Sequence, residues 1–270
     1  MSGREGRDPE THGEGAFVPE SLWRRLTVAP HRLLAFDFDG TLAPYARDPL
    51  DARALPEALE RLARLAGRDA TTIAVVSGRP IPNLERVVPI ERLHFVGEHG
   101  WEERPPGADT IHHPLPQEAA EALARILDVV TREGTKAKVE RKRTGVAVHT
   151  RALDRDERDR ALAHFESVFR RAAEGAGLRL DVLDGGAEAH AAGRDKGTAL
   201  RALLAALPSG TVPVYVGDDV TDEPAFEAAQ ERGFGIKVGP AATRARHALD
   251  GPHAVAGLLA GLLRALEETA

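Results

Sequence analysis

Two kinds of hydrophobic pattern alternate along the chain. Short apolar runs at 33–36 and 72–76 each end in a turn rich in Gly, Asp or Ser, and leucines recur at helical spacing over 55–65 between them. Runs of this length are typical of strands buried on both faces, and the helical spacing predicts a helix with one buried side. Strand, helix and strand joined by short links predict a doubly wound, Rossmann-like parallel sheet of the α/β class. The same reasoning predicts further strands at 93–96, 212–216 and 235–239, and helices at 18–26, 196–207 and 255–262.

The pattern changes between Arg104 and about His190. Alternating apolar and polar residues replace the buried runs, and two amphipathic stripes begin at Ala119 and Ala161. Alternation with period two predicts half-buried strands, and the stripes predict helices that cover one face of their sheet. We therefore expect an inserted, smaller α+β cap domain, with a four-stranded antiparallel sheet and two helices behind it. The predicted parts are a disordered tail at 1–17, a core at 18–103 and 191–270, and the cap at 104–190.

Composition narrows the possible partners. The 36 Lys and Arg against 42 Asp and Glu give a net charge of −6, so no dominant basic surface is available for nucleic acid. No apolar run approaches the length of a membrane span, and the polar N-terminal stretch lacks the apolar core of a signal peptide. The absence of cysteine excludes disulfides and thiolate metal sites. We expect a cytoplasmic monomer that binds neither nucleic acid nor membrane.

Two carboxylates follow the first predicted strand. Asp37 and Asp39 are two positions apart, so they share a face and can reach one point where the turn begins. Two neighbouring ionised carboxylates repel each other, so we expect a divalent cation or a shared proton between them. Gly40 lets the backbone turn, and Thr41 adds a hydroxyl beside N–H groups that could hold an anion. Such a pair suits phosphoryl transfer, with one aspartate attacking phosphorus and the other protonating the leaving alcohol. An isolated Asp-x-Asp is more often an ordinary acidic turn.

Other polar groups are expected at the same edge of the sheet. Ser77 ends the second strand, where its hydroxyl can donate to a phosphoryl oxygen. Lys196 stands at a helix start, which is unfavourable for the helix dipole unless an anion is near. Asp218, Asp219 and Asp222 crowd another strand end, and their mutual repulsion favours a metal with oxygen ligands, such as Mg²⁺. Each signal alone also fits an ordinary strand end or an exposed lysine.

The open face of the predicted cap sheet carries acids and bases together. Period two places Lys138, Glu140, Lys142, His149 and Arg151 on that face, and the last strand adds Glu188 and His190. A mixed face beside a phosphate site suits a sugar with many hydroxyls, whereas a solvated sheet face is the plainer interpretation. His99, at the end of the third strand, could likewise be structural.

The run Asp37–Pro44 resembles the first motif of the haloacid-dehalogenase-like phosphatases, and the remaining motifs follow in order. This resemblance implies Mg²⁺ held by Asp37, Asp218 and the main-chain carbonyl of Asp39, with Asp219 and Asp222 in support. It implies that Asp37 is the nucleophile and Asp39 the acid. It also implies a phosphate site made of Thr41, Ser77, Gly78 and Lys196.

Two further elements are similar to trehalose-6-phosphate phosphatases within that superfamily. They are Gly97-Glu98-His99-Gly100 and Glu140-Arg141-Lys142. The resemblance implies a capped phosphatase that hydrolyses trehalose 6-phosphate to trehalose and phosphate through an aspartyl-phosphate. It implies sugar contacts from Arg79, His99, Glu140, Lys142, His149, Arg151, Glu188 and His190.

One family element departs from expectation. A Glu-x-Lys/Arg-Pro stretch is typical before the third catalytic motif, and this chain has Glu188-Ala189-His190-Ala191. A titratable ring thus replaces a fixed cation, which leaves the sugar open. A glucosyl- or mannosyl-3-phosphoglycerate or sucrose phosphate remains an alternative substrate. An inactive sugar-phosphate sensor or regulatory subunit is another alternative, although a pure binder has no use for the Asp37 and Asp39 pair.

Overall fold

An eight-stranded sheet forms the framework of the core. The computed structural model describes residues 18–183 and 185–269, so the predicted tail at 1–17 lies outside the described residues. The strands are β1 (Arg32–Phe36), β2 (Thr71–Val76), β3 (His94–Gly97), β4 (Glu102–Arg104), β5 (Ile111–His112), β10 (Val212–Gly217), β11 (Phe234–Val238) and β12 (His247–Leu249). Their order is β12-β11-β10-β1-β2-β3-β4-β5, with β1 parallel to both of its neighbours.

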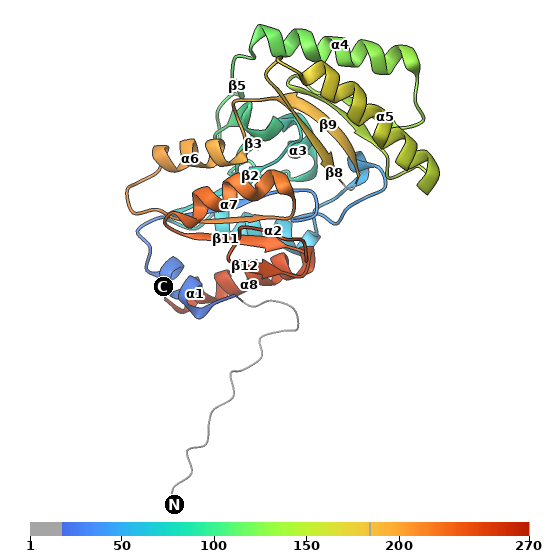
Figure 1. Ribbon diagram of the computed structural model, residues 1–270. Helices are drawn as coiled ribbons and strands as arrows, with labels where there is room; N and C mark the ends of the chain where they lie inside the picture. Colours follow the sequence, from blue (N-terminus) through green and yellow to red (C-terminus); the bar gives the residue numbers. More distant parts are fainter. Residues whose placement is uncertain (1–17, 184, 270) are drawn as a thin grey trace, which may run out of the picture.

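Helices cover both faces of this sheet (Figure 1). Leu34 and Phe36 of β1 pack on the side of α1 (Glu20–Thr27), α2 (Pro56–Ala66), α3 (Ile81–Val87) and α8 (Pro252–Glu268). Leu33 and Ala35 pack on the other side, against α6 (Lys196–Ala206) and α7 (Glu223–Gln230). A strand buried on both faces has no polar side to offer, which explains its continuous apolar run. The predicted doubly wound α/β class is confirmed.

The far edge of the core sheet is antiparallel. β4 pairs with β3, and β5 pairs with β4. The core sheet therefore reaches past the predicted boundary at Arg104, as far as His112. Short 3₁₀ turns complete the core at η1 (Pro49–Asp51), η2 (Glu98–Gly100) and η3 (Val220–Asp222).

The inserted cap has its own sheet and its own buried cluster. Its strands are β6 (Lys138–Arg141), β7 (Gly145–His149), β8 (Leu178–Leu183) and β9 (Gly186–Ala191), all antiparallel in the order β6-β7-β9-β8. Helices α4 (Gln117–Glu133) and α5 (Arg155–Ala173) pack against one face of this sheet. Ile126, Val148 and Phe169 belong to the cluster between them. The expected four strands and two helices are present.

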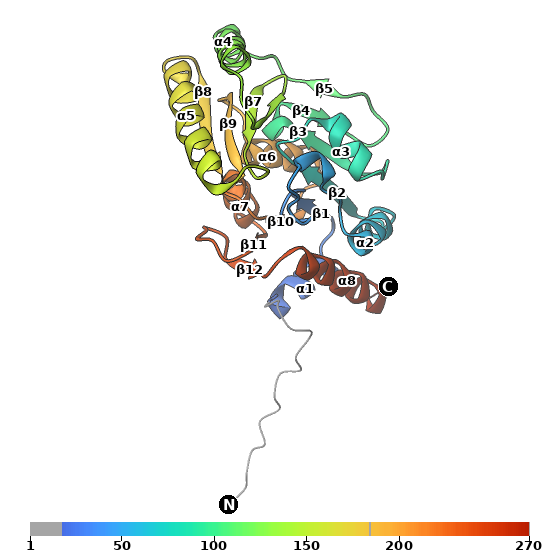
Figure 2. The ribbon, with the colours of Figure 1, turned by 90° about the vertical axis from the view of Figure 1, so that its right-hand side faces the viewer.

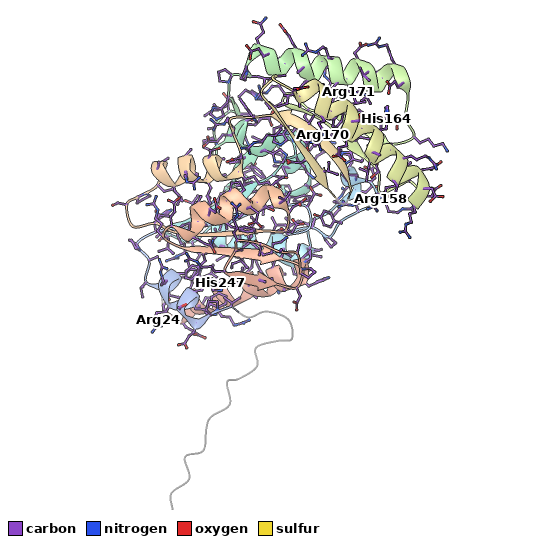
Figure 3. The ribbon with its side chains drawn as sticks, viewed as in Figure 1. Arg24, Arg158, His164, Arg170, Arg171 and His247 are labelled. Atoms are coloured by element: carbon purple, nitrogen blue, oxygen red, sulfur yellow. The ribbon has the colours of Figure 1, made fainter. Side chains whose placement is uncertain are left out.

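The outer face of the cap helices is charged (Figure 3). His164 of α5 lies 2.6 Å from Glu133 of α4, and Arg170 lies 2.5 Å from Glu166 within α5. These pairs are solvent-exposed, so they add little stability. Among the described residues, no helix combines the length and the apolar character that a membrane crossing needs.

The cap lies over one end of the core (Figure 2). Glu98 of the core is buried, and its carboxylate accepts hydrogen bonds from the main-chain N–H groups of Arg143 and Thr144 in the β6–β7 turn, at 2.9 and 2.8 Å. Lys138 of β6 makes a second link, with its ammonium 2.5 Å from the Asp48 carboxylate in the loop after β1. The sheet face without helices is thereby turned toward the carboxyl ends of the core strands.

Candidate active site

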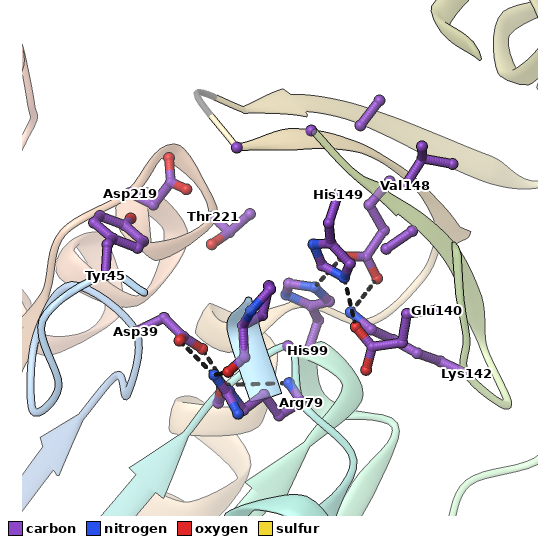
Figure 4. A pocket seen from close by; sticks show the side chains of 18 of the residues that line it. Asp39, Tyr45, Arg79, His99, Glu140, Lys142, Val148, His149, Asp219 and Thr221 are labelled. Atoms are coloured by element: carbon purple, nitrogen blue, oxygen red, sulfur yellow. Dashed lines mark hydrogen bonds and ion pairs between the residues drawn. The ribbon is translucent and has the colours of Figure 1, made fainter. Parts of the chain in front are cut away.

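A pocket lies between the carboxyl ends of the core strands and the polar face of the cap sheet (Figure 4). Its empty space is about 890 Å³, including the part that opens to solvent. Because core and cap both line it, its shape depends on how the two are joined. The predicted site residues that line it are Asp37, Asp39, Ser77, Gly78, Arg79, His99, Glu140, Lys142, His149, Arg151, Glu188, Lys196 and Asp219.

Asp37 lies at the base of this pocket, directly after β1. One of its carboxylate oxygens is 2.8 Å from the Lys196 ammonium. Burial raises the pKa of Asp37; the Lys196 charge opposes this rise, and the charges of Asp222 and Asp218 add to it. The Lys196 charge therefore does not fully stabilise the ionised form of Asp37.

Lys196 is held between two carboxylates. Its ammonium lies 2.8 Å from Asp37 and 2.8 Å from Asp222, and only 2% of its side chain is exposed. Burial alone would lower the pKa of Lys196, but these two carboxylates raise it above its ordinary value. Asp222 is itself fixed, because its other hydrogen bonds come from the Tyr215 hydroxyl at 2.7 Å and from two main-chain N–H groups of the turn after β10. The arrangement presents a permanent positive charge beside Asp37.

Three carboxylates meet at one point of the site. Oxygens of Asp37, Asp218 and Asp222 all lie within 4.8 Å of one another. Burial and the neighbouring Asp222 charge raise the pKa of Asp218 to about 7. Asp222 already accepts four hydrogen bonds, so Asp37 and Asp218 are the carboxylates best able to bind an ion. Buried carboxylates with disfavoured charge fit a hard divalent cation, which would balance them.

Gly40 makes the approach of Asp218 to the first loop possible. Its φ is +76°, a left-handed conformation, and a Cβ at this position would lie 2.1 Å from an Asp218 carboxylate oxygen. Any other residue would push the carboxylate away. Contact with Asp218 thus explains why position 40 of the first motif is a glycine, and the sequence alone did not show this contact.

Two hydroxyls contact the Asp218 carboxylate. Thr41 donates to it at 3.2 Å, is fully buried and does not line the pocket. Tyr45 also donates to it, and the Arg151 guanidinium lies 3.9 Å from the centre of the Tyr45 ring. Figure 4 shows Tyr45 on the same side of the pocket as Asp219, across from His149, Glu140 and Lys142. Tyr45 was missed by the sequence analysis, since a tyrosine in a loop carries no distinguishing pattern.

Asp39 is paired with Arg79. The Arg79 Nε and Nη2 atoms each lie 2.6 Å from a carboxylate oxygen of Asp39, a bidentate contact. Arg79 also donates to the Pro49 carbonyl, and its guanidinium lies 4.8 Å from the centre of the Phe38 ring. Planar contacts of this kind fix both partners in direction. In this state Asp39 faces Arg79 rather than an empty part of the pocket.

The second strand end supports His99. The Ser77 hydroxyl accepts from the Arg79 N–H at 3.3 Å and lines the pocket. A Cβ at Gly78 would lie 2.5 Å from Nε2 of His99, so glycine leaves the space that this ring fills. His99 and its neighbour Glu98 have φ values of 55° and 46°, left-handed conformations that cost about 1–3 kcal/mol each outside glycine. Strain of this size concentrates at functional positions.

The cap wall consists of two side-chain pairs, each with a carboxylate and a nitrogen group. His149 of β7 lies 2.9 Å from Glu140 of β6, and Lys142 lies 2.7 Å from Glu188 of β9. Burial raises the pKa of Glu188, but the charge of Lys142 and the contact with His99 outweigh this and hold it below its ordinary value. The wall thus offers fixed donors and acceptors to a polar ligand.

Five of the predicted residues lie outside the pocket lining: Thr41, Asp218 and Asp222, which are described above, and also His190 and Lys138. His190 is buried behind the wall, where it contacts Asp181, and Lys138 pairs with Asp48 at the junction of cap and core. The sequence analysis also missed Lys237, a buried lysine that donates to the main-chain carbonyl of Asp218. Side-chain direction at these positions depends on contacts between distant segments, which no local pattern encodes.

The fold and site together define a class. A doubly wound core with an aspartate after its first strand, a lysine at a helix start and an inserted α+β cap is the architecture of the haloacid-dehalogenase-like superfamily. Within it, the chain belongs to the trehalose-phosphatase family, whose model matches residues 35–253. It is 36% identical over 257 residues to proteins named trehalose-phosphate phosphatase from Mycobacterium tuberculosis and Mycobacterium bovis. The alignment covers 89% of this chain and 63% of each relative, so the chain spans less than two thirds of their length.

Solved structures share the fold. The C-terminal domain of a trehalose-6-phosphate phosphatase from Candida albicans has a TM-score of 0.79 at 21% identity, covering 92% of this chain and 98% of that one. The C-terminal domain of a trehalose synthase regulatory protein from the same organism has a TM-score of 0.70 at 13% identity, covering 93% and 99%. Both likenesses concern the fold alone.

Proposed function

We propose that this protein is a Mg²⁺-dependent phosphatase that hydrolyses trehalose 6-phosphate to trehalose and phosphate. The observation that carries the proposal is the contact between the Asp37 carboxylate and the Lys196 ammonium, at the base of a pocket whose opposite wall is the charged face of the cap sheet. A nucleophile beside a fixed cation suits a phosphoryl group, and the paired acids and bases opposite suit a polyhydroxylated sugar. The names of the mycobacterial relatives supply the particular sugar.

The first step forms an aspartyl-phosphate. An Asp37 oxygen attacks phosphorus, the bond between phosphorus and the sugar oxygen breaks, and Asp39 supplies the proton that the leaving oxygen takes up. Arg79 must release Asp39 for this transfer, because the present bidentate contact occupies both carboxylate oxygens. Lys196 and the Ser77 hydroxyl offset the charge of the phosphoryl oxygens.

The second step returns the enzyme to its starting state. Asp39 takes a proton from water, the water oxygen attacks phosphorus, and the bond between phosphorus and Asp37 breaks to release phosphate. Asp37 and Asp218 would hold Mg²⁺, with Asp219 and the main-chain carbonyl of Asp39 nearby; the ion would balance the buried carboxylates and the phosphate charge. We expect the enzyme to act in the cytoplasm as a monomer, and both expectations stay predictions.

Phosphate release from a panel of substrates tests the proposal. The panel contains trehalose 6-phosphate, sucrose 6-phosphate, glucosyl-3-phosphoglycerate and glucose 6-phosphate, each with Mg²⁺ and each beside the Asp37→Asn variant. We expect a strong preference for trehalose 6-phosphate and a loss of at least about 10³-fold in the variant, since it lacks the nucleophile. Preference for another sugar phosphate would keep the chemistry and reject the substrate. No release from any substrate would favour a regulatory role instead.

A further inference from the structure

Behind the cap wall, Asp181 and His190 form a pair that lies outside the pocket lining. The register of β8 and β9 places Asp181 opposite Glu188 and Arg179 opposite His190, so these four side chains share one face of the sheet. His190 is 4% exposed, and its Nε2 lies 2.8 Å from an Asp181 carboxylate oxygen. Its Nδ1 lies 3.3 Å from the Ala191 carbonyl oxygen. Both ring nitrogens face an acceptor, and only the ring protonated on both nitrogens donates to both.

The His190 ring stacks on His99. The two ring centres are 4.9 Å apart with an angle of 27° between the planes. His99 lines the pocket, and its Nε2 is buried without a hydrogen-bond partner among the described residues; the nearest Glu188 oxygen is 3.7 Å away. Figure 4 shows His99 on the side of the pocket where His149 and Lys142 lie. A buried polar atom without a partner at a pocket wall is available to a ligand.

The groups around His190 carry both signs of charge. Burial lowers the pKa of His99; the Glu188 charge opposes this, and the charges of His190 and Lys142 add to it. His99 thus stays neutral, with one nitrogen free to exchange a hydrogen bond with a hydroxyl. The charged and titratable groups that face His190 are Asp181 and Arg179 on β8, Glu188 on β9, His99 on η2 and Lys142 from the β6–β7 turn.

We propose that His190, held by Asp181, is a positioning residue that fixes the His99 ring so that Nε2 of His99 binds a hydroxyl of the sugar. The inference rests on the proposed function, because it assigns one determinant of sugar recognition at the same site. It also gives a reason for the altered Glu188-Ala189-His190-Ala191 element. The ring at 190 directs its Nε2 to Asp181 and presents its face to His99, so it does not line the pocket.

Kinetics of two variants test the proposal. His190→Phe keeps a ring that can stack on His99 but removes both nitrogens, and Asp181→Asn removes the charge that holds His190. Each should raise KM for trehalose 6-phosphate about tenfold while kcat stays within about threefold, because one sugar hydrogen bond is weakened and the phosphoryl chemistry is untouched. The double variant should be no worse than His190→Phe, since Asp181 acts only through His190.

A matched pair on the outer side of the cap provides the control. His164 and Glu133 lie 2.6 Å apart on the exposed face of α5 and α4, far from the pocket lining. His164→Phe and Glu133→Gln should leave both kinetic constants unchanged. His190→Gln should fall between wild type and His190→Phe, because its amide can still donate to Asp181 while the stacking ring is lost.

Ring ¹⁵N spectra of the full chain give a readout that does not depend on turnover. We expect the Nε2 resonance of His190 to show a proton donated to a carboxylate, and Asp181→Asn should shift that resonance while the resonances of the control His164 stay unchanged. An unchanged KM in His190→Phe and Asp181→Asn would overturn the inference. A rise in KM that is matched by an equal fall in kcat and by a lower thermal stability would also overturn it. If the wild type releases no phosphate from trehalose 6-phosphate, the proposed function fails; an Asp181→Asn variant whose His190 and His99 resonances are unchanged would overturn this inference separately.

Discussion

Several residues of this site contribute by fixing the position of a neighbouring side chain through hydrogen bonds and ion pairs. Asp222 has no exposed surface and accepts hydrogen bonds from the Lys196 ammonium, the Tyr215 hydroxyl and two main-chain N–H groups. A carboxylate so fully used has little left for a ligand. Its contribution is to hold Lys196 toward Asp37 and to fix the turn that carries Asp218.

Removing Asp222 should destabilise the folded protein. In Asp222→Ala we expect a loss of about 3–5 kcal/mol in the free energy of unfolding, because the buried Lys196 loses one of its two charge partners. Urea unfolding followed by circular dichroism measures this. The matched change Asp219→Ala removes a half-buried cap of η3 and should cost only about 1 kcal/mol. Equal losses in the two variants would contradict the assigned role, and Asp222→Asn, which keeps an acceptor, should lie between them.

The loop between β1 and α2 is the element that joins cap, core and site. Its Tyr45 contacts Asp218 and lies beneath Arg151, and its Asp48 pairs with Lys138 of β6. Both cap contacts are partly exposed, whereas the Glu98 contacts at the other side are buried. Such an arrangement suits a cap that turns about its buried junction and opens at the exposed one to admit substrate.

The Asp48–Lys138 pair should therefore couple only weakly. In a double-mutant cycle with Asp48→Asn and Lys138→Met, we expect a coupling of about 0.2–1 kcal/mol in the free energy of unfolding, because both side chains are about two fifths exposed. The coupling should shrink at 1 M salt. The exposed pair Asp128 and Arg132 within α4 serves as the comparison cycle. A coupling above about 2 kcal/mol would mean that the cap is locked to the core at this point.

At the scale of the whole molecule, charge balance links metal binding to stability. The raised pKa values of Asp37 and Asp218 mean that folding brings carboxylates together at a cost when no cation is bound. An ion that binds the folded chain and not the unfolded one should offset that cost. The folded state is therefore expected to respond to Mg²⁺ even without substrate.

Thermal unfolding with and without Mg²⁺ tests this directly. At a concentration about 100 times its Kd, Mg²⁺ should add about 2.7 kcal/mol to the free energy of unfolding, and chelation should reverse the effect. Asp218→Asn should remove most of the gain, whereas Glu118→Gln, on the outside of α4, should keep it. Full stabilisation of Asp218→Asn by Mg²⁺ would place the ion elsewhere.

Acid should lower the stability of the folded protein through carboxylates in the cap wall and behind it. The pKa values of Glu140, Asp181 and Glu188 are lowered, because the charges and hydrogen bonds of their Lys142 and histidine partners outweigh burial. The unfolded chain protonates these groups at a higher pH than the folded chain, so it binds more protons there and stability falls as pH decreases below about 5. Denaturant unfolding between pH 6 and 3.5 should show this fall in the free energy of unfolding. The fall should be smaller in Glu188→Gln than in the control variant Glu118→Gln. An equal fall in both variants would exclude Glu188 as a source.

The sequence by itself determined the architecture and the edge at which the chemistry lies. Buried runs and helical stripes dictate a doubly wound core, and parallel strands end at a common edge, so Asp37, Ser77 and Lys196 had to approach one another. Alternation with period two likewise dictated the cap sheet and the face that carries Glu140 and Glu188. These features follow from local periodicity, which each segment carries within itself.

The tertiary structure alone decided which side chains meet across segments. Whether Thr41 faces a phosphate or Asp218, whether His190 enters the pocket or stacks behind it on His99, and whether Tyr45 reaches Asp218 all depend on how the cap sits on the core. Those contacts join residues far apart in the chain, and their geometry is set by packing and by the charges that burial leaves unbalanced. No periodicity records that choice, because it arises only once the two sheets face each other.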